Sequence, residues 1–276
     1  MQRIFFLLVL FLPLLGVGQN HEPVTLGAGN AGKGFTRLST LNAFAPANNQ
    51  AAMAFMEHAE VGVFGQRAFL VEGVDFASFS GVLPTNAGSF GLSASYFGFE
   101  AYNEQQFRLA YGRKLARNFS IGASFDMLST RMAEYGNFTT FTVELSMLYA
   151  ISDDLWLSAH TFNPMQVELV EGENPVPTTM SLGLRYASTA TVRMFLEAQQ
   201  EWDSGLSIRG GIEYEPLEWL ILRAGTMTQP VQFTFGLGIQ IDPLWMDLAY
   251  AYHPLLGSTP MLSLRYTFAK DKNQQL

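Results

Sequence analysis

The sequence predicts an all-β protein, a closed antiparallel transmembrane β-barrel of about 14 strands. Three observations predict this fold: a low content of charged residues, a two-residue alternation through most of the chain, and tyrosines at the ends of the alternating segments. Of the 276 residues, 48% are hydrophobic and only 14% are charged, whereas a soluble domain carries about 25% charged residues. We therefore expect much of the surface to face lipid.

Residues 1–18 have the pattern of a secretory signal peptide. Arg3 precedes a short apolar run, and Gly16 and Gly18 stand just before Gln19, as at a cleavage site. A membrane anchor is the less favoured alternative, because Pro13 interrupts the run and no later stretch reaches the 18 or so apolar residues of a spanning helix. The absence of cysteine excludes a lipoprotein anchor and disulfides.

Residues 59–268 form a series of about 14 segments in which apolar residues alternate with small or polar ones, divided by turn clusters. In 180–186, M-S-L-G-L-R-Y, one set of alternate positions is oily, and the other holds serine, glycine and arginine. An even number of such strands is typical of an outer-membrane barrel. A soluble β-sandwich would show the same alternation, so further signals are needed to decide.

Tyrosines at the ends of even-numbered strands favour the membrane. If the N-terminus is periplasmic, these rings lie on the oily face at the inner lipid–water boundary, which suits their amphipathic character. Connections also alternate between short ones, such as P-T-N-A-G, and longer ones, such as R-M-A-E-Y-G-N, as expected of periplasmic turns and extracellular loops. The predicted periplasmic girdle consists of Tyr111, Tyr149, Tyr186, Tyr214, Tyr266 and Phe268.

Charged residues within the strands fall on the small or polar face. An arginine facing lipid at mid-membrane costs about 2–4 kcal/mol, so we expect these side chains to line the lumen. They either form a structural network that closes the lumen or guide an anionic or amphipathic solute. The predicted lumen charge network is Arg108, Asp126, Glu144, Arg185, Arg193, Glu197, Arg209, Glu213, Arg223, Asp247 and Arg265.

Residues 19–58 do not alternate, and we predict that they form a hatch that folds into the periplasmic mouth and packs on the lumen wall. A phosphate-binding loop is disfavoured, because no strand precedes the glycines and no G-K-S/T follows them. The barrel is predicted over 59–268 and a polar periplasmic tail over 269–276. The predicted hatch residues are Gly27, Gly29, Gly32, Gly34, Asn48 and Asn49.

No chemistry of catalysis or metal binding is predicted. The four histidines are scattered, without ligand spacing. His160 beside Glu144 is the one candidate base, but no G-x-S-x-G elbow accompanies it. We expect no enzyme activity and no cofactor. The net charge of −8 and the lack of a basic stripe exclude nucleic acid as a partner.

Several stretches resemble a known family. They are G-A-G-N-A-G-K-G at 27–34, the pattern around 48–54, S-A-H-T-F-N-P-M at 158–165 and the closing Y-H-P-L-L-G-S-T-P-M-L-S-L-R-Y-T-F. In this order they resemble FadL-type outer-membrane proteins, and more closely the smaller PorV- and PorQ-like barrels of Bacteroidetes associated with type IX secretion. The chain departs from the FadL-type N-P-A signature, since it reads Asn49, Gln50, Ala51. Most loops are also short for this family, so no ligand residue is carried over.

The resemblance implies residence in the outer membrane of a Gram-negative bacterium, among its lipids. The first functional hypothesis is a PorV/PorQ-like accessory or adaptor barrel, with other outer-membrane or secretion-system proteins as partners. The alternative hypothesis is a FadL-like passive transporter, with a hydrophobic or amphipathic small molecule as ligand.

Overall fold

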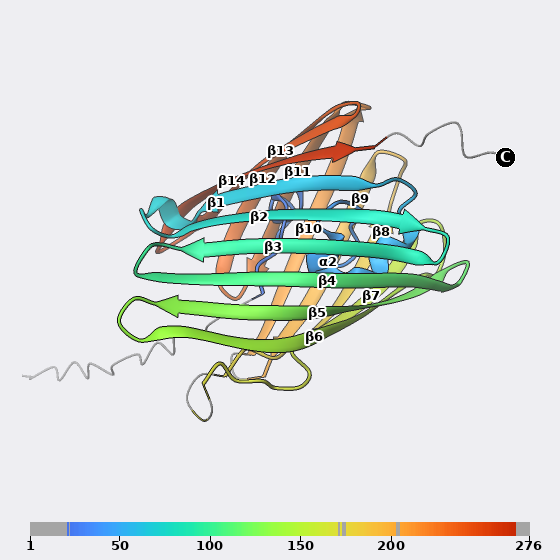
Figure 1. Ribbon diagram of the computed structural model, residues 1–276. Helices are drawn as coiled ribbons and strands as arrows, with labels where there is room; N and C mark the ends of the chain where they lie inside the picture. Colours follow the sequence, from blue (N-terminus) through green and yellow to red (C-terminus); the bar gives the residue numbers. More distant parts are fainter. Residues whose placement is uncertain (1–20, 22, 171, 173–174, 203–204, 269–276) are drawn as a thin grey trace, which may run out of the picture.

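The computed structural model describes residue 21 and residues 23–170, 172, 175–202 and 205–268. Fourteen antiparallel strands close into a barrel, in which each strand pairs with its sequence neighbours and β1 pairs with β14 (Figure 1). The predicted fold class is therefore confirmed. The strands are β1 (Glu60–Arg67), β2 (Asp75–Thr85), β3 (Gly88–Gly98), β4 (Tyr102–Ala116), β5 (Phe119–Met132), β6 (Gly136–Ala150), β7 (Leu155–Phe162), β8 (Thr179–Ala187), β9 (Val192–Glu201), β10 (Gly205–Leu217), β11 (Leu220–Thr228), β12 (Val231–Ile241), β13 (Leu244–His253) and β14 (Gly257–Thr267).

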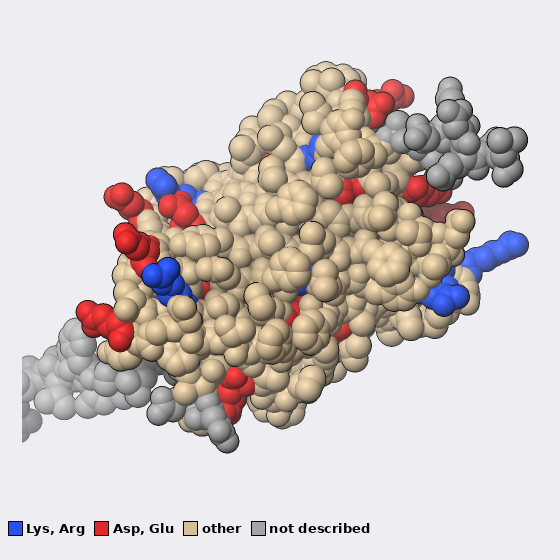
Figure 2. Space-filling model, viewed as in Figure 1, with Lys and Arg blue, Asp and Glu red and all other residues tan. Residues whose placement is uncertain are grey.

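The alternation of the sequence becomes an inner and an outer face. In β8, Met180 and Leu182 are 63% and 65% exposed on the outside, while Ser181 between them is 3% exposed on the inside. Figure 2 shows the result on one face of the molecule, where charged side chains gather at the two ends and the belt between them carries almost none. Such a belt is expected of a wall that faces lipid.

The two ends of the barrel differ in their connections. At the end where β1 begins and β14 ends, here called the turn end, the strands are joined by tight connections such as 86–87 and 117–118. The opposite end, the loop end, carries the connection of 163–178 between β7 and β8. The predicted length difference between the two ends is weaker than expected, because only 133–135 separate β5 from β6 and 99–101 separate β3 from β4.

The segment before β1, residue 21 and residues 23–59, lies inside the barrel and is called the plug (Figure 1). It contains α1 (Ala28–Ala31), α2 (Ala45–Asn48) and the 3-10 helix η1 (Gln50–Phe55). A further 3-10 turn, η2 (Ala68–Leu70), lies in the β1–β2 connection. Among the described residues, no helix has the length and apolar character needed to cross a bilayer. The predicted signal peptide and C-terminal tail lie outside the described residues.

The hydrophobic core lies between the plug and the wall. One cluster joins Leu26, Ala28 and Phe44 of the plug to Phe64 and Phe76 of the wall, and a second surrounds the fully buried Met53. Two hydrogen bonds join separate parts of the plug. Leu26 N–H donates to Asn48 Oδ1 at 3.1 Å, and Asn48 Nδ2 donates to Leu26 O at 2.9 Å. Burial of both apolar and amide groups thus fixes the plug in one place.

Candidate functional site in the barrel lumen

Glycines of the plug meet glycines of the wall on β10–β12. A Cβ on Gly211 would overlap the carbonyl oxygen of Lys33, and a Cβ on Gly225 would overlap the backbone N of Gly34. Gly34 itself has a φ of +72° and lies against the carbonyl oxygen of Gly210. Its N–H donates to Thr234 Oγ1 at 2.8 Å. Only glycine allows two backbones to approach this closely.

A second contact of this kind lies on β4 and β5. A Cβ on Gly112 would overlap the carbonyl oxygen of Gln50, and a Cβ on Gly122 would overlap the backbone N of Ala51. Ala51 N–H donates to Ser146 Oγ at 2.9 Å, and Ser120 Oγ donates to Ala51 O at 2.8 Å. The plug is therefore held on two parts of the wall.

The predicted hatch residues all lie at close contacts of the plug. Gly27, with a φ of +94°, lies under the ring of Phe44, and Gly29 packs on Asp247 and Arg223. A Cβ on Gly32 would lie 2.7 Å from Cα of Gly236. Asn49, the first residue of the Asn49, Gln50, Ala51 stretch that departs from the N-P-A signature, accepts from Ala51 N–H at 3.1 Å through Oδ1 and donates to Leu38 O through Nδ2.

The predicted charged residues all lie on the inner face of the wall, and three of them meet His160 there. Arg108 donates to Asp126 Oδ2 at 2.9 Å through Nε and to Glu144 Oε1 at 2.6 Å through Nη2. His160 Nε2 lies 2.9 Å from Glu144 Oε2, which also accepts from Gln50 of the plug. All four wall residues are at most 5% exposed.

A longer chain of ion pairs follows the wall at the turn end. Its charges alternate in sign across β9, β10, β11, β13, β14 and β1, and every link is an ion pair within 3.4 Å. We call this chain the ladder. Its members, in spatial order, are Glu215, Arg193, Glu213, Arg223, Asp247, Arg265 and Glu60.

Strand β12 contributes no residue to the ladder, yet the ladder continues across it. Arg223 on β11 donates to Asp247 on β13 at 2.7 Å, although β12 lies between them. The bridge crosses over Gly238 of β12, where a Cβ would lie 2.7 Å from Arg223 Nη1 and 2.8 Å from Asp247 Oδ1. The inward glycine thus makes room for an ion pair between non-adjacent strands.

The remaining predicted charges contact the plug or stand apart. Glu197 accepts from the backbone N–H groups of Arg37 at 2.5 Å and Leu38 at 2.6 Å. Arg209 Nη1 lies 3.4 Å from Phe35 O. Arg185 has no carboxylate within 4 Å among the described residues, and its guanidinium carbon lies 5.0 Å from the ring centre of Trp156. Arg185 therefore borders the lumen cavity but joins no ion pair of the network.

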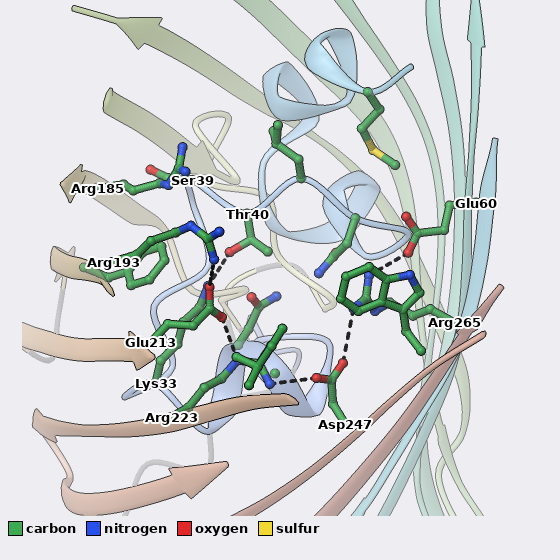
Figure 3. Close-up of a pocket in the computed structure, with 18 of the residues that line it drawn as sticks. Lys33, Ser39, Thr40, Glu60, Arg185, Arg193, Glu213, Arg223, Asp247 and Arg265 are labelled. Carbon is green, nitrogen blue, oxygen red and sulfur yellow. Dashed lines mark hydrogen bonds and ion pairs between the residues drawn. The ribbon is translucent and has the colours of Figure 1, made fainter. Parts of the chain in front are cut away.

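Between the plug and the wall at the turn end lies a cavity of about 510 Å³, called the turn-end chamber (Figure 3). The ladder forms one side of it, and Ser39, Thr40 and Asn42 of the plug form another. Lys33 reaches the chamber from the plug, donates to Thr40 Oγ1 at 2.7 Å and lies 3.9 Å from the ring centre of Phe195. Burial lowers the pKa of Lys33 to about 8.

A second cavity of about 230 Å³, the loop-end chamber, lies beyond the plug toward the loop end. Apolar side chains of the plug and of Phe76 and Phe97 form much of its lining, and Glu104 and Arg108 add charge. His21 borders it, with its N–H donating to Glu104 Oε2 at 2.9 Å and its Nε2 lying 2.9 Å from Thr130 Oγ1. Burial lowers the pKa of His21 to about 4.

The candidate base His160 is fully enclosed rather than open to a solute. Its side chain is 0% exposed and its Nε2 is occupied by Glu144. Among the described residues, no group of three or more histidines and carboxylates is placed to hold a metal ion. This surrounding is that of a structural histidine.

The predicted girdle tyrosines point outward near the turn end. Tyr149, Tyr186 and Tyr214 are 40%, 45% and 45% exposed. Tyr111 donates from its hydroxyl to Ala87 O at 2.5 Å, and Tyr266 packs edge-on against Phe268 with ring centres 4.8 Å apart. These rings therefore lie on the outer face near the turn end, and their place at a lipid–water boundary stays a prediction.

Several residues of the lumen were missed by the sequence interpretation. Glu60 and Glu215, which end the ladder, share the inward parity of their strands and could have been found from it. Lys33 and Arg37 of the plug carry no such signal, because the plug has no strand period. Trp156 is likewise an inward aromatic residue whose contact with Arg185 follows only from the pairing of β7 with β8.

The fold and its plug define a class of protein: a closed barrel of the outer-membrane type with an N-terminal segment folded inside its lumen. Among solved structures, the chain is similar to a Pseudomonas aeruginosa FadL homologue, with a TM-score of 0.68 at 11% identity over 88% of this chain and 98% of that one. The CymD monoaromatic hydrocarbon channel matches with a TM-score of 0.67 at 12% identity over 89% and 98% of the two chains.

The P. putida toluene transporter TodX matches with a TM-score of 0.66 at 12% identity, over 89% of this chain and 99% of that one. The chain thus has the fold of FadL-type outer-membrane barrels. No family model and no curated protein sequence matches it. The predicted adaptor role in type IX secretion finds no support in these comparisons and stays a prediction from the sequence.

Proposed function

We propose that this protein is an outer-membrane channel through which hydrophobic or amphipathic small molecules pass without an energy source. The observation that carries the proposal is the shared fold, since the similar structures include a monoaromatic hydrocarbon channel and a toluene transporter. In this proposal the turn end faces the periplasm and the loop end faces the outside, as the direction of the strands and the tyrosine girdle suggest.

The loop-end chamber supports the proposal by its mixed lining. Phe76, Phe97 and Leu26 offer apolar surface, while Glu104 and Arg108 lie at the same cavity. A pocket with an apolar body and a few polar groups suits an amphipathic molecule, because each part of the ligand meets matching surface. Such a molecule would enter at the loop end and meet the plug next.

The plug lies between the two chambers, so passage through the lumen requires part of it to move. The Oγ atoms of Ser39 in the plug and Ser158 in the wall lie 3.1 Å apart. Since the chain has no cysteine, the double variant Ser39→Cys with Ser158→Cys introduces a single thiol pair that can lock the plug to β7. Thr139→Cys with Ser129→Cys, whose oxygens lie 3.2 Å apart on β6 and β5, links two wall strands and serves as the matched control.

The test is uptake of radiolabelled toluene or decanoate by cells whose outer membrane carries the protein. We expect faster uptake than in cells without it, loss of that gain when the Ser39→Cys/Ser158→Cys pair is oxidised, and recovery on reduction. The wall-to-wall pair should have no effect in either state. Uptake equal to that of cells without the protein would contradict the channel, and uptake that continues past a locked plug would contradict passage through the plug region.

A further inference from the structure

Two cations of the turn-end chamber lie outside the ladder. Arg185 has no carboxylate within 4 Å among the described residues and stacks on Trp156. Lys33 is 2% exposed and is held by Thr40 and by the ring of Phe195, neither of which carries charge. In Figure 3 both side chains project from the same side of the cavity, with Arg193 between them.

The charges of the chamber leave a positive surplus. The ladder joins three arginines to four carboxylates, so by itself it is one negative charge in excess. Lys33 and Arg185 turn this into a surplus of one positive charge. Glu57 and His58 also border the cavity, but both are exposed at its mouth, where water screens their charge.

Arg185 on β8 has Arg193 on β9 as a neighbour. Arg185 pairs across the strands with Phe195, two residues from Arg193 on the same inward face, so the two guanidinium groups are diagonal neighbours. Arg193 repels Arg185 electrostatically, but Arg193 is itself ion-paired with Glu213 and Glu215, which attract Arg185. Arg185 is therefore the one of these two arginines without a carboxylate partner, and an anion beside it supplies acceptors to its donor groups and balances the surplus charge of the chamber.

We propose that the turn-end chamber binds a small organic monocarboxylate, whose carboxylate group lies on Arg185 at the edge of Phe195. A carboxylate fits the planar donor fork of a guanidinium, and one negative charge balances the chamber. An organic body is indicated because the cavity, at about 510 Å³, is far larger than an inorganic ion and includes the rings of Phe195 and Trp245.

Ser39 lies beside Arg185 and Thr40 beside Arg193, and both line the chamber (Figure 3). They offer further hydrogen bonds to polar substituents of the bound molecule. The site opens toward the turn end and not into the loop-end chamber, so its occupation does not depend on transport. Absence of uptake would not contradict this binding site, and absence of binding here would not contradict transport through the barrel.

The experiment is calorimetric titration of the purified full-length protein in detergent with benzoate, benzyl alcohol and inorganic phosphate. We expect benzoate to bind and the other two to bind at least tenfold more weakly, because the alcohol lacks the charge and phosphate lacks the apolar body. Arg185→Gln should weaken benzoate binding at least tenfold, as expected when a charge-assisted hydrogen bond is lost. Arg185→Lys keeps the charge but not the planar donor fork, so its affinity for benzoate should lie between those of the unchanged protein and of Arg185→Gln.

Arg113→Gln is the matched control, because Arg113 is exposed at the same end of the barrel but does not line the chamber. It should bind benzoate as the unchanged protein does. A heat-dependent shift in gel mobility shows for each variant that the barrel is folded. Equal binding of benzoate and benzyl alcohol, tighter binding of phosphate, or a folded Arg185→Gln protein with undiminished affinity would each overturn the proposal.

Discussion

At the scale of single residues, the inward glycines of the wall are explained by the plug. Glycine weakens a strand, because it adds backbone entropy to the unfolded chain and packs no side chain. Gly211 and Gly225 nevertheless occupy the middle of β10 and β11, where the backbone of Lys33 and Gly34 lies directly against them. Because these two residues have no Cβ, the backbone of the plug has room to lie against the wall.

Gly211→Ala should therefore disturb the plug, whereas Gly210→Ala should not. A Cβ on Gly211 overlaps backbone atoms of Lys33, which cannot rotate away, while a Cβ on Gly210 meets nothing within 4 Å. Overpacking of this kind costs about 1–3 kcal/mol. We expect faster tryptic cleavage after Lys33 and Arg37 in the first variant. Equal cleavage of the two variants would show that the plug contact is looser than described.

His21 makes the seating of the plug sensitive to acid. Its pKa is lowered from 6.5 to about 4 because the ring is buried, so a released His21 takes up a proton at a pH where the seated one stays neutral. Acidification from pH 6.5 to 4 therefore favours release, by roughly 3 kcal/mol at the low end. Amide hydrogen exchange over 23–26, corrected for its intrinsic pH dependence, should rise accordingly.

His21→Gln is the control for this effect, since an amide can still bond to Thr130 but does not titrate in this range. Exchange in that variant should rise less between pH 6.5 and 4 than in the unchanged protein, and any remaining response belongs to other groups such as Glu104, which accepts from the N–H of residue 21. If both proteins respond equally to acid, another group controls the release.

The sequence predicts the side on which a charged residue lies better than it predicts its partner. The alternation of side chains between the two faces of a strand is enough to predict that Arg185 and Arg223 lie in the lumen. It does not show that Arg223 reaches Asp247 across an intervening strand, because this depends on the glycine at 238, nor that Arg185 stacks on Trp156 instead of forming an ion pair.

At the scale of strands, the ladder links six of them through side chains in addition to the backbone hydrogen bonds. Its inner members are nearly dehydrated, with Arg223 and Asp247 at 8% and 2% exposure. Dehydrating two charges costs about as much as their attraction returns, so the ladder need not stabilise the barrel relative to an apolar wall. Removal of an inner member is a different matter, because its partners stay buried and each loses one of its counter-charges.

Asp247→Ala should lower the free energy of unfolding by about 3–5 kcal/mol, since it leaves both Arg223 and Arg265 without this carboxylate. Asp75→Ala removes half of an ion pair with Arg67 whose side chains are 45% and 50% exposed, and should have little effect. The comparison is made by urea unfolding in lipid vesicles. A similar loss for both variants would mean that the ladder is open to water.

The strands themselves were predictable because each carries its own period, which survives in any sequence context. The connections were less so, since R-M-A-E-Y-G-N was expected to be a longer loop and instead contributes residues to β5 and β6 on both sides of 133–135. Polar residues at a strand end can continue the backbone hydrogen bonding of the sheet as readily as they can begin a loop. Composition alone therefore does not mark the end of a strand.

At the scale of the whole molecule, the outer face is a belt whose tolerance for charge should depend on depth. Leu262 lies in the middle of β14 and Tyr266 near its end, both on the outer face at 43% and 39% exposure. Leu262→Arg should cost about 2–4 kcal/mol and Tyr266→Arg about 0–1 kcal/mol, measured by unfolding from lipid vesicles. Equal costs would contradict the proposed depth of the girdle.

The position of the plug is the part of the structure that the sequence predicted least. A hatch was expected from the absence of alternation in 19–58, but its contacts join residues such as Gly34 and Gly210 that are far apart in the chain. Nothing local in either segment indicates the other. Only the closed barrel brings them together.

The two glycine contacts also determine how the plug can leave. β4 and β5 lie across the barrel from β11 and β12 in the order of strands, so a sideways shift that relieves one contact compresses the other. The plug is therefore held between two opposite parts of the wall, and a pull along the barrel axis must break both contacts together. Drawn out by its N-terminus in a single-molecule force experiment, it should yield in one rupture, and a staircase of smaller steps would contradict this.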